Sequence, residues 1–254
     1  MCVTLRAMTY CLAMNLDAGL VFCSDSRTNA GPDRVSIYSK LHRFSFRNDR
    51  QLAILTAGNL GTTQAVTAAV ARDLKSDKAM TVFRAEDIET IADYIGELSV
   101  AIQRKYAPGG QEAGFNAEAT FLVGGQIRGE QPELYLVYPE GNHIRASNRH
   151  PFLQSGEIKY GKPIIDRIVK RDTPVEIAMR CALVSMDSTM RSNATVGPPI
   201  ELLYLRKDEF SEPAYYRLFE ENDEYLLRLR ESWDENIRIA FSNLPALEYE
   251  ELIV

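Results

Sequence analysis

The chain has 254 residues, of which 45% are hydrophobic and 25% are charged, and its formal net charge at pH 7 is −6. This composition is typical of a folded globular protein, and the length allows one large domain or two small ones. The net negative charge argues against a nucleic-acid partner. No apolar run reaches the roughly 20 residues that a membrane-spanning helix needs, so a membrane is also an unexpected partner.

Residues 1–8 are too short for a secretory signal with an apolar core. Two interpretations of them remain open. They are either a propeptide that is removed before Thr9, or an over-long start whose true initiator is Met8. In the second case, removal of the initiator methionine exposes the same threonine amine. In both cases the folded domain is expected to cover residues 9–254.

The first two predicted strands form a hairpin around the turn at residues 17–19. A three-residue loop that ends in a left-handed glycine pairs Leu16 with Leu20. Side chains alternate between the two faces of a strand, so this register makes Thr9 and Asp25 diagonal neighbours on one face. A two-residue loop would shift the register by one and move Asp25 to the other face. The expected proximity of Thr9 and Asp25 therefore depends on an odd loop.

The remaining elements follow as strands, two helices, strands, two helices, strands and a last helix. Strands are predicted at residues 36–46, 51–56, 120–127, 133–138, 143–147, 200–206 and 214–219. Helices are predicted at residues 62–75, 88–106, 156–170, 173–187 and 225–241. This segregation predicts an α+β domain in which two antiparallel sheets stack face to face, with helix pairs outside.

Two helix starts carry capping signals. Asn59 is the expected N-cap of the first helix. Thr173, Pro174 and Glu176 form a capping-box pattern at the start of a helix that runs towards Asp187.

The cysteines and histidines indicate no metal site and no cofactor. The four cysteines, Cys2, Cys11, Cys23 and Cys181, show no C-x-x-C spacing, which favours buried thiols in a reducing, cytoplasmic setting over disulfides. The three histidines, His42, His143 and His150, are isolated and lack the spacing of zinc ligands.

Thr9 is the first residue with a possible chemical role. A threonine hydroxyl is a poor nucleophile unless a neighbouring base takes its proton. An α-amine, with an unperturbed pKa of about 7.7–8.0, suits that task and lies on the same residue when Thr9 is the free N-terminus. Without this context, Thr9 is an ordinary strand residue, Lys40 a surface lysine, Asp25 a strand-end cap and Gly58 a turn glycine.

The motifs together are more specific than any one of them. The chain carries Met-Thr-Tyr-Cys at residues 8–11, Ser-Asp-Ser-Arg-Thr-Asn-Ala-Gly at 24–31, Lys40, and Thr-Ala-Gly-Asn at 56–59. This set resembles the N-terminal nucleophile hydrolases of the proteasome β-subunit family, and most of all its bacterial branch called Anbu. The resemblance covers nearly the whole chain from Thr9 onward. It implies a four-layer αββα sandwich.

The resemblance also implies roles for individual residues. Lys40 would lower the pKa of the terminal amine, Asp25 would keep Lys40 charged and oriented, and the Gly58 amide would bind the oxyanion. Ser155 would hydrogen-bond the terminal amine. Asp187, with a nearby hydroxyl, would orient that amine. Met190 stands where the family pattern has a serine, which leaves Ser188 and Ser192 as candidate hydroxyls. Thr28, Asn29 and Thr56 would contact the substrate.

The resulting interpretation is a threonine-type N-terminal nucleophile hydrolase that cleaves peptide or amide bonds in peptides or proteins. Two alternatives remain open: an amidase or transferase-like enzyme acting on a small peptide or metabolite, and a catalytically silent assembly subunit. The resemblance further implies self-assembly into a ring or an open spiral, and a possible ATP-dependent unfoldase partner.

Overall fold

A computed structural model describes residues 9–29, 35–46, 48–78, 80–107 and 116–247. Residues 1–8, and with them the choice between a propeptide and an over-long start, lie outside the described residues. The chain divides into two compact units, Met1–Glu221 and Asn222–Val254. Within the part of the chain that the structure describes, no helix is both long and apolar enough to cross a membrane.

The first unit contains two five-stranded antiparallel sheets and one short hairpin. The first sheet has the order β10 (Phe152–Gly156), β1 (Tyr10–Leu16), β2 (Gly19–Asp25), β11 (Ile200–Arg206) and β12 (Tyr215–Phe219). The second has the order β5 (Leu41–Phe46), β6 (Arg50–Gly58), β7 (Ala119–Ile127), β8 (Glu133–Val137) and β9 (His143–Arg145). The hairpin pairs β3 (Arg27–Asn29) with β4 (Val35–Ile37).

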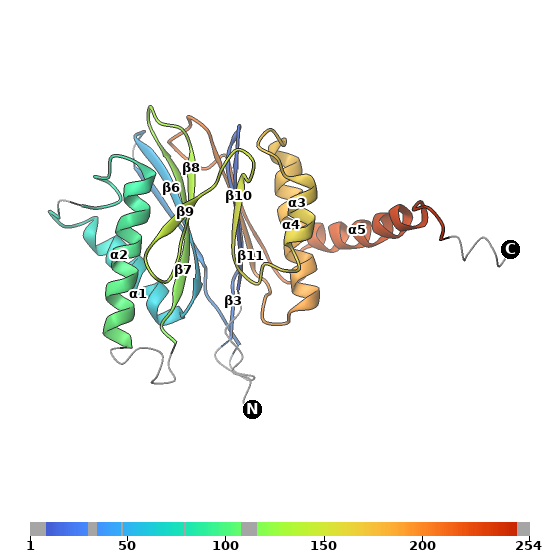
Figure 1. Cartoon of the computed structure of the whole chain (residues 1–254), viewed down its shortest axis with the longest axis horizontal. Coiled ribbons are helices and arrows are strands. Elements are labelled where there is room, and N and C mark those ends of the chain that lie inside the picture. Colours follow the sequence, from blue (N-terminus) through green and yellow to red (C-terminus); the bar gives the residue numbers. More distant parts are fainter. Residues whose placement is uncertain (1–8, 30–34, 47, 79, 108–115, 248–254) are drawn as a thin grey trace. The chain divides into compact units, whose positions relative to one another are not determined.

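The helices of this unit form the two outer layers (Figure 1). The second sheet is covered by α1 (Leu60–Asp73) and α2 (Ile88–Tyr106), and the first by α3 (Lys162–Ile168) and α4 (Val175–Ser192). The predicted four-layer αββα arrangement is confirmed.

Alternate residues of the central strands supply two separate cores. On β7, Phe121 and Val123 pack with Ile91 and Ile95 of α2, whereas Leu122 belongs to the cluster between the two sheets. Because both faces of the sheet are buried, these strands read as continuous apolar runs. The apolar stripe of α2 explains why its bounds match the prediction: the residues that repeat every three or four positions are those that meet the sheet.

The register of the first hairpin differs from the prediction. Leu16 pairs with Gly19 and Ala13 with Phe22, so the turn has two residues and the expected pairing of Leu16 with Leu20 is wrong. Gly19 has a φ of +135° and also pairs with β11, where a β-carbon on it would lie 2.2 Å from the carbonyl oxygen of Leu205. Gly19 is therefore the first residue of β2, paired closely with β11, and is not part of the turn.

Three further predictions about elements need correction. The predicted strand at residues 36–46 is divided into β4 and β5 by residues 38–40, which lie in neither strand. The predicted helix at residues 156–170 is shortened to α3, and β10, which precedes it, was not predicted. The capping box is absent from α4: the Thr173 hydroxyl accepts a hydrogen bond from the Lys170 amide and donates one to the Ile168 carbonyl. By contrast, Asn59 caps α1 as predicted, accepting from the Thr62 amide.

The second unit is built around α5 (Glu224–Ser242), whose N-cap is Asp223. Several large apolar side chains of this unit are exposed, among them Ile237, Ile239, Phe241, Leu244 and Leu247.

The cysteines that the structure describes, Cys11, Cys23 and Cys181, are free and buried. Burial raises the pKa of each thiol, to about 12 for Cys181. Cys2 lies outside the described residues.

Candidate functional site

Thr9 is fixed by its backbone immediately before β1 begins. Its carbonyl oxygen accepts a hydrogen bond of 2.7 Å from the amide of Glu157, and the neighbouring residue Tyr10 pairs with Gly156 of β10. Only 7% of Thr9 is exposed. The strand β10 therefore determines where Thr9 lies.

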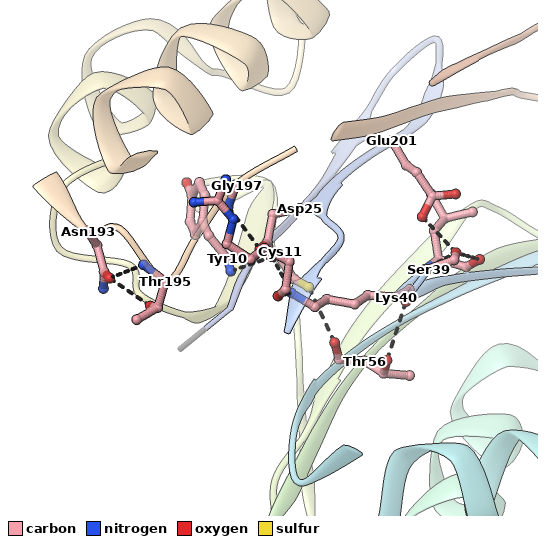
Figure 2. A network of polar contacts seen from close by, with 12 residues as sticks. Tyr10, Cys11, Asp25, Ser39, Lys40, Thr56, Asn193, Thr195, Gly197 and Glu201 are labelled. Carbon is pink, nitrogen blue, oxygen red and sulfur yellow. Dashed lines mark hydrogen bonds and ion pairs between the residues drawn. The ribbon is translucent and has the colours of Figure 1, made fainter. Parts of the chain in front are cut away.

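Lys40 and Asp25 form a buried ion pair close to this point (Figure 2). The Nζ atom of Lys40 lies 2.6 Å from Oδ1 of Asp25 and donates a second hydrogen bond of 2.7 Å to the Arg27 carbonyl. The Asp25 carboxylate also accepts from the amides of Tyr10 and Gly197, at 3.1 and 3.3 Å. A charged pair that is supported by several further hydrogen bonds in this way can persist in the protein interior.

Burial is the largest influence on Asp25 and raises the pKa of its carboxyl group. The Lys40 ammonium and the two backbone amides act in the opposite direction because they stabilise the carboxylate.

The ion pair connects the two sheets. Asp25 is the last residue of β2 in the first sheet, and Lys40 directly precedes β5 in the second. The predicted hairpin register is wrong, yet the predicted contact between Asp25 and Lys40 is made. Asp25 lies at a strand end, and Lys40 reaches it from the opposite sheet.

A cavity of about 90 Å³ brings several predicted residues together. Thr9 and Lys40 line it, and so do Thr28, Thr56 and Gly58. The amide of Thr56 donates to the carbonyl of Lys40 at 3.0 Å, which ties β6 to the residue that carries the ammonium group. The nucleophile candidate and the lysine therefore face one space.

Gly58 ends β6 with a φ of +102°. A β-carbon at this position would lie 2.5 Å from the carbonyl oxygen of Glu118, so only glycine fits there without a shift of the backbone. At Gly58 the cavity wall is therefore formed by the main chain and not by a side chain.

His42 is the histidine of the cavity lining. Burial lowers the pKa of its imidazole, and the nearby Glu201 carboxylate partly offsets this effect. Because its pKa is lowered from 6.5, the ring is largely neutral at pH 7.

Four other predicted site residues that the structure describes, Ser155, Asp187, Ser188 and Ser192, are not part of this lining. Ser155 on β10 pairs with Cys11 of β1, and its hydroxyl is hydrogen-bonded to that of Thr120 at 2.5 Å. On α4, Asp187 is buried, Ser188 is half-buried and Ser192 is exposed. Asn29 ends β3, and its side chain lies outside what the structure describes.

The segment after α4 contributes contacts that the sequence interpretation missed. Asn193 accepts from the Thr195 amide and hydroxyl, and its side-chain amide donates to Glu157, the residue whose backbone binds Thr9. Gly197, four residues further on, donates to Asp25 (Figure 2). A glycine before Pro198-Pro199 is a turn signal, which is the one hint that the sequence offered.

Among the residues that the structure describes, no three His, Cys, Asp or Glu side chains are grouped so that they could hold a metal ion.

Comparison with protein-family models gave no match, and no curated protein sequence matched the chain. Solved structures do match. Anbu (ancestral β-subunit) from Yersinia bercovieri is 39% identical with a TM-score of 0.88, and the alignment covers 94% of this chain and 99% of that one. The structure described as the helical assembly of the Anbu complex from Pseudomonas aeruginosa is 40% identical with a TM-score of 0.88, covering 94% and 98%.

Anbu from Hyphomicrobium sp. strain MC1 is 38% identical with a TM-score of 0.85, and the alignment covers 94% of this chain and 99% of that one. These matches extend over almost the full length of both chains at well over 30% identity. The chain therefore belongs to the Anbu family of ancestral proteasome β-subunits.

Proposed function

We propose that this chain is a threonine-type N-terminal nucleophile hydrolase that cleaves peptide or amide bonds, with Thr9 as its nucleophile once the residues before it are removed. The observation that carries the proposal is the buried ion pair of Lys40 and Asp25, whose lysine lines the same cavity as Thr9. Buried charged groups in a cavity are costly and are concentrated at functional sites.

The proposed reaction needs only groups of this chain and a water molecule. The neutral α-amine of Thr9 takes the proton of its own hydroxyl, and Oγ1 attacks the substrate carbonyl. The Gly58 amide donates a hydrogen bond to the oxyanion of the tetrahedral intermediate. When the C–N bond breaks, the protonated amine returns its proton to the leaving amine, and an ester on Thr9 remains. Water, deprotonated by the same amine, then hydrolyses the ester.

Lys40 serves this reaction through its charge. An ammonium group near the terminal amine disfavours a second positive charge, so more of that amine is neutral at pH 7. Asp25 holds the ammonium in place and offsets the cost of burying it.

The remaining predicted residues support the amine and the substrate. Ser155 hydrogen-bonds the amine, and Asp187 orients it. Of the two candidate hydroxyls near Asp187, we favour Ser188, because it is half-buried on α4 whereas Ser192 is exposed. Thr28 and Thr56 contact the substrate from the cavity wall, together with Asn29 at the end of β3.

Intact-mass measurement of the purified chain and of two variants tests this function. The wild-type chain is expected to begin at Thr9 and to hydrolyse fluorogenic peptides. A variant with an uncleavable residue in front of Thr9 should assemble normally but show no hydrolysis, since its α-amine is an amide nitrogen. Thr9→Ala should be inactive, and its intact mass will show whether the residues before position 9 are removed without the threonine hydroxyl. Full activity of the extended variant would refute the mechanism, and a wild-type chain that still starts at Met1 and is inactive would favour a silent assembly subunit.

We further propose that the chain assembles with copies of itself. The Pseudomonas aeruginosa relative is described as a helical assembly. In this chain, Phe241 of α5 is 76% exposed and Ile239 is 52% exposed, and exposed apolar groups of this size are typical of interfaces. Light scattering should show a species far above the 28.6 kDa of one chain. Phe241→Glu should reduce its size, whereas Arg238→Glu on the same helix should not. A wild-type monomer would contradict this proposal.

A further inference from the structure

Glu201 is a buried carboxylate on the inner face of β11. It is 4% exposed, and the next residues on that face, Leu203 and Leu205, belong to the apolar core between the two sheets. A charged group in this position is destabilising unless it is well hydrogen-bonded. Its presence in an otherwise apolar strand therefore calls for an explanation.

Two hydroxyl groups bind this carboxylate. The Ser39 hydroxyl donates to Oε2 at 2.7 Å, and the Tyr216 hydroxyl donates to Oε1 at 2.9 Å. Figure 2 shows the first of these contacts, between β11 and the segment that leads into β5. The described part of the chain places no ion pair on Glu201, so hydrogen bonds to hydroxyl groups are what hold it.

Ser39 directly precedes Lys40 in a segment without strand pairing. Residues 38–40 belong to neither β4 nor β5, so no sheet ladder fixes them. The Ser39 hydroxyl accepts a hydrogen bond of 3.3 Å from the Leu41 amide, and the Lys40 carbonyl accepts one of 3.0 Å from Thr56. The backbone of Lys40 is thus held by Thr56 on its own sheet and, through Ser39, by Glu201 on the other sheet.

We propose that Glu201 is a positioning residue that holds Lys40 in place through Ser39, so that the ammonium group stays beside Thr9. The inference rests on the proposed function, because it assigns Lys40 the task of tuning the Thr9 amine. Glu201 reaches neither Thr9 nor the substrate, and its effect is transmitted through the backbone of residues 39 and 40.

A carboxylate suits this role better than an amide. Each of its oxygens accepts one hydroxyl, and hydrogen bonds to a charged acceptor are shorter and stronger than neutral ones. In Glu201→Gln one of the two oxygens becomes an NH2 group, which donates and cannot accept, so one of the two hydroxyls loses the acceptor that it has in the wild type. The variant keeps the size of the side chain and removes the charge.

Steady-state kinetics of Glu201→Gln, Ser39→Ala and the double variant test the proposal. Each single change should lower kcat by about tenfold, the scale of one charge-assisted hydrogen bond, with KM within twofold. The double variant should be no slower than the singles, because both remove the same link. Tyr216→Phe is the matched control: it removes the other hydroxyl from Glu201, leaves Ser39 in place and should keep kcat within twofold.

The pH profile separates positioning from a merely structural effect. The amine must be neutral to act as base, and the Lys40 ammonium lowers its pKa. The charged and titratable groups around that ammonium are Asp25, which is paired with it, and Arg27 and His42, which line the same cavity. If the ammonium is displaced, the pKa of the amine rises, so the acid limb of kcat/KM should move to higher pH in Glu201→Gln and Ser39→Ala. Loss of folded protein alone would lower the rate without moving that limb.

The outcomes are distinguishable. Wild-type kcat and an unmoved acid limb in both single variants, or a double variant whose losses multiply, would overturn the inference while the proposed function stands. A wild-type chain with a free Thr9 and no hydrolysis would refute the proposed function and this inference with it. Ser39→Ala keeps the test valid if Glu201→Gln folds poorly, because Ser39 lies at the surface.

Discussion

A β-carbon on Gly156 would lie 1.8 Å from the carbonyl oxygen of Thr9. Gly156 ends β10 with a φ of +85°, a conformation that other residues rarely adopt. The glycine lets β10 approach the start of β1 so closely that the next amide, that of Glu157, binds the Thr9 carbonyl. The position of Thr9 therefore depends on the absence of a side chain at residue 156.

We expect Gly156→Ala to lower kcat/KM by about 100-fold, because a displacement of a nucleophile by about 1 Å costs that much. Gly129→Ala is the matched control: Gly129 has a φ of +92° but has no neighbouring atom within 4 Å of an added β-carbon. Both variants carry backbone strain, but only Gly156→Ala displaces Thr9. Rates of peptide hydrolysis and thermal unfolding of the two variants check this prediction. Equal rates of hydrolysis in Gly156→Ala and Gly129→Ala would contradict it.

Lys40→Ala should leave the Asp25 carboxylate buried without its ion pair. We expect the unfolding free energy to fall by about 3 kcal/mol and the rate of hydrolysis by about 100-fold. Lys40→Arg should not restore the rate, since a planar guanidinium cannot replace a compact ammonium. Lys78→Ala, which removes a lysine paired with Asp73 at the end of α1, is the control for the rate. A near wild-type rate in Lys40→Ala would show that Lys40 does not tune the amine.

Asp87 caps α2 and should make a pH-dependent contribution to stability. Its carboxylate accepts from the Thr90 amide at 2.7 Å, and this hydrogen bond lowers the pKa of Asp87 below 3.8 in the folded chain. A lowered folded pKa means that the contribution is present above about pH 3.8 and is lost as the pH falls through the folded value. Asp87→Ala should cost about 1 kcal/mol at pH 7.

Urea unfolding at a series of pH values checks this prediction. The difference in unfolding free energy between wild type and Asp87→Ala should shrink below about pH 3.8. Glu86 is a neighbouring exposed residue, and Glu86→Ala should have nearly the wild-type unfolding free energy at every pH. A difference that is independent of pH would show that the carboxylate charge is not what stabilises α2.

Local patterns predicted the bounds of α2 and α5 closely, and contacts between distant segments explain failures elsewhere. The stripe of Ile88, Ile91 and Ile95 fixes α2 because one face of the helix meets one sheet. The hairpin turn was misassigned because Gly19 pairs with β11, which lies about 185 residues further along the chain. No local sequence pattern indicates this pairing. The Thr173 side chain likewise bonds backward to residues 168 and 170 instead of capping α4.

The candidate site was predictable only in part for the same reason. Motifs around Thr9, Asp25, Lys40 and Gly58, through the family resemblance that they carry, indicated the contact between Asp25 and Lys40. The residues that hold them, such as Gly197 beside Asp25, come from segments whose proximity follows from the fold alone. Strand β10 lacks clear alternation because its neighbours bury most of it, so its role in placing Thr9 was not visible.

The buried cysteines bear on how labelling experiments are read. A thiol reacts with electrophiles as its thiolate, and burial raises the pKa of Cys11, Cys23 and Cys181, so each stays protonated at neutral pH. Cys2 precedes Thr9 and is lost when the chain begins at Thr9. A folded chain that starts at Thr9 should thus gain the mass of a single probe even when the probe also attacks thiols. Gains of two to four probe masses would report unfolded molecules, which makes the labelling stoichiometry a measure of folding.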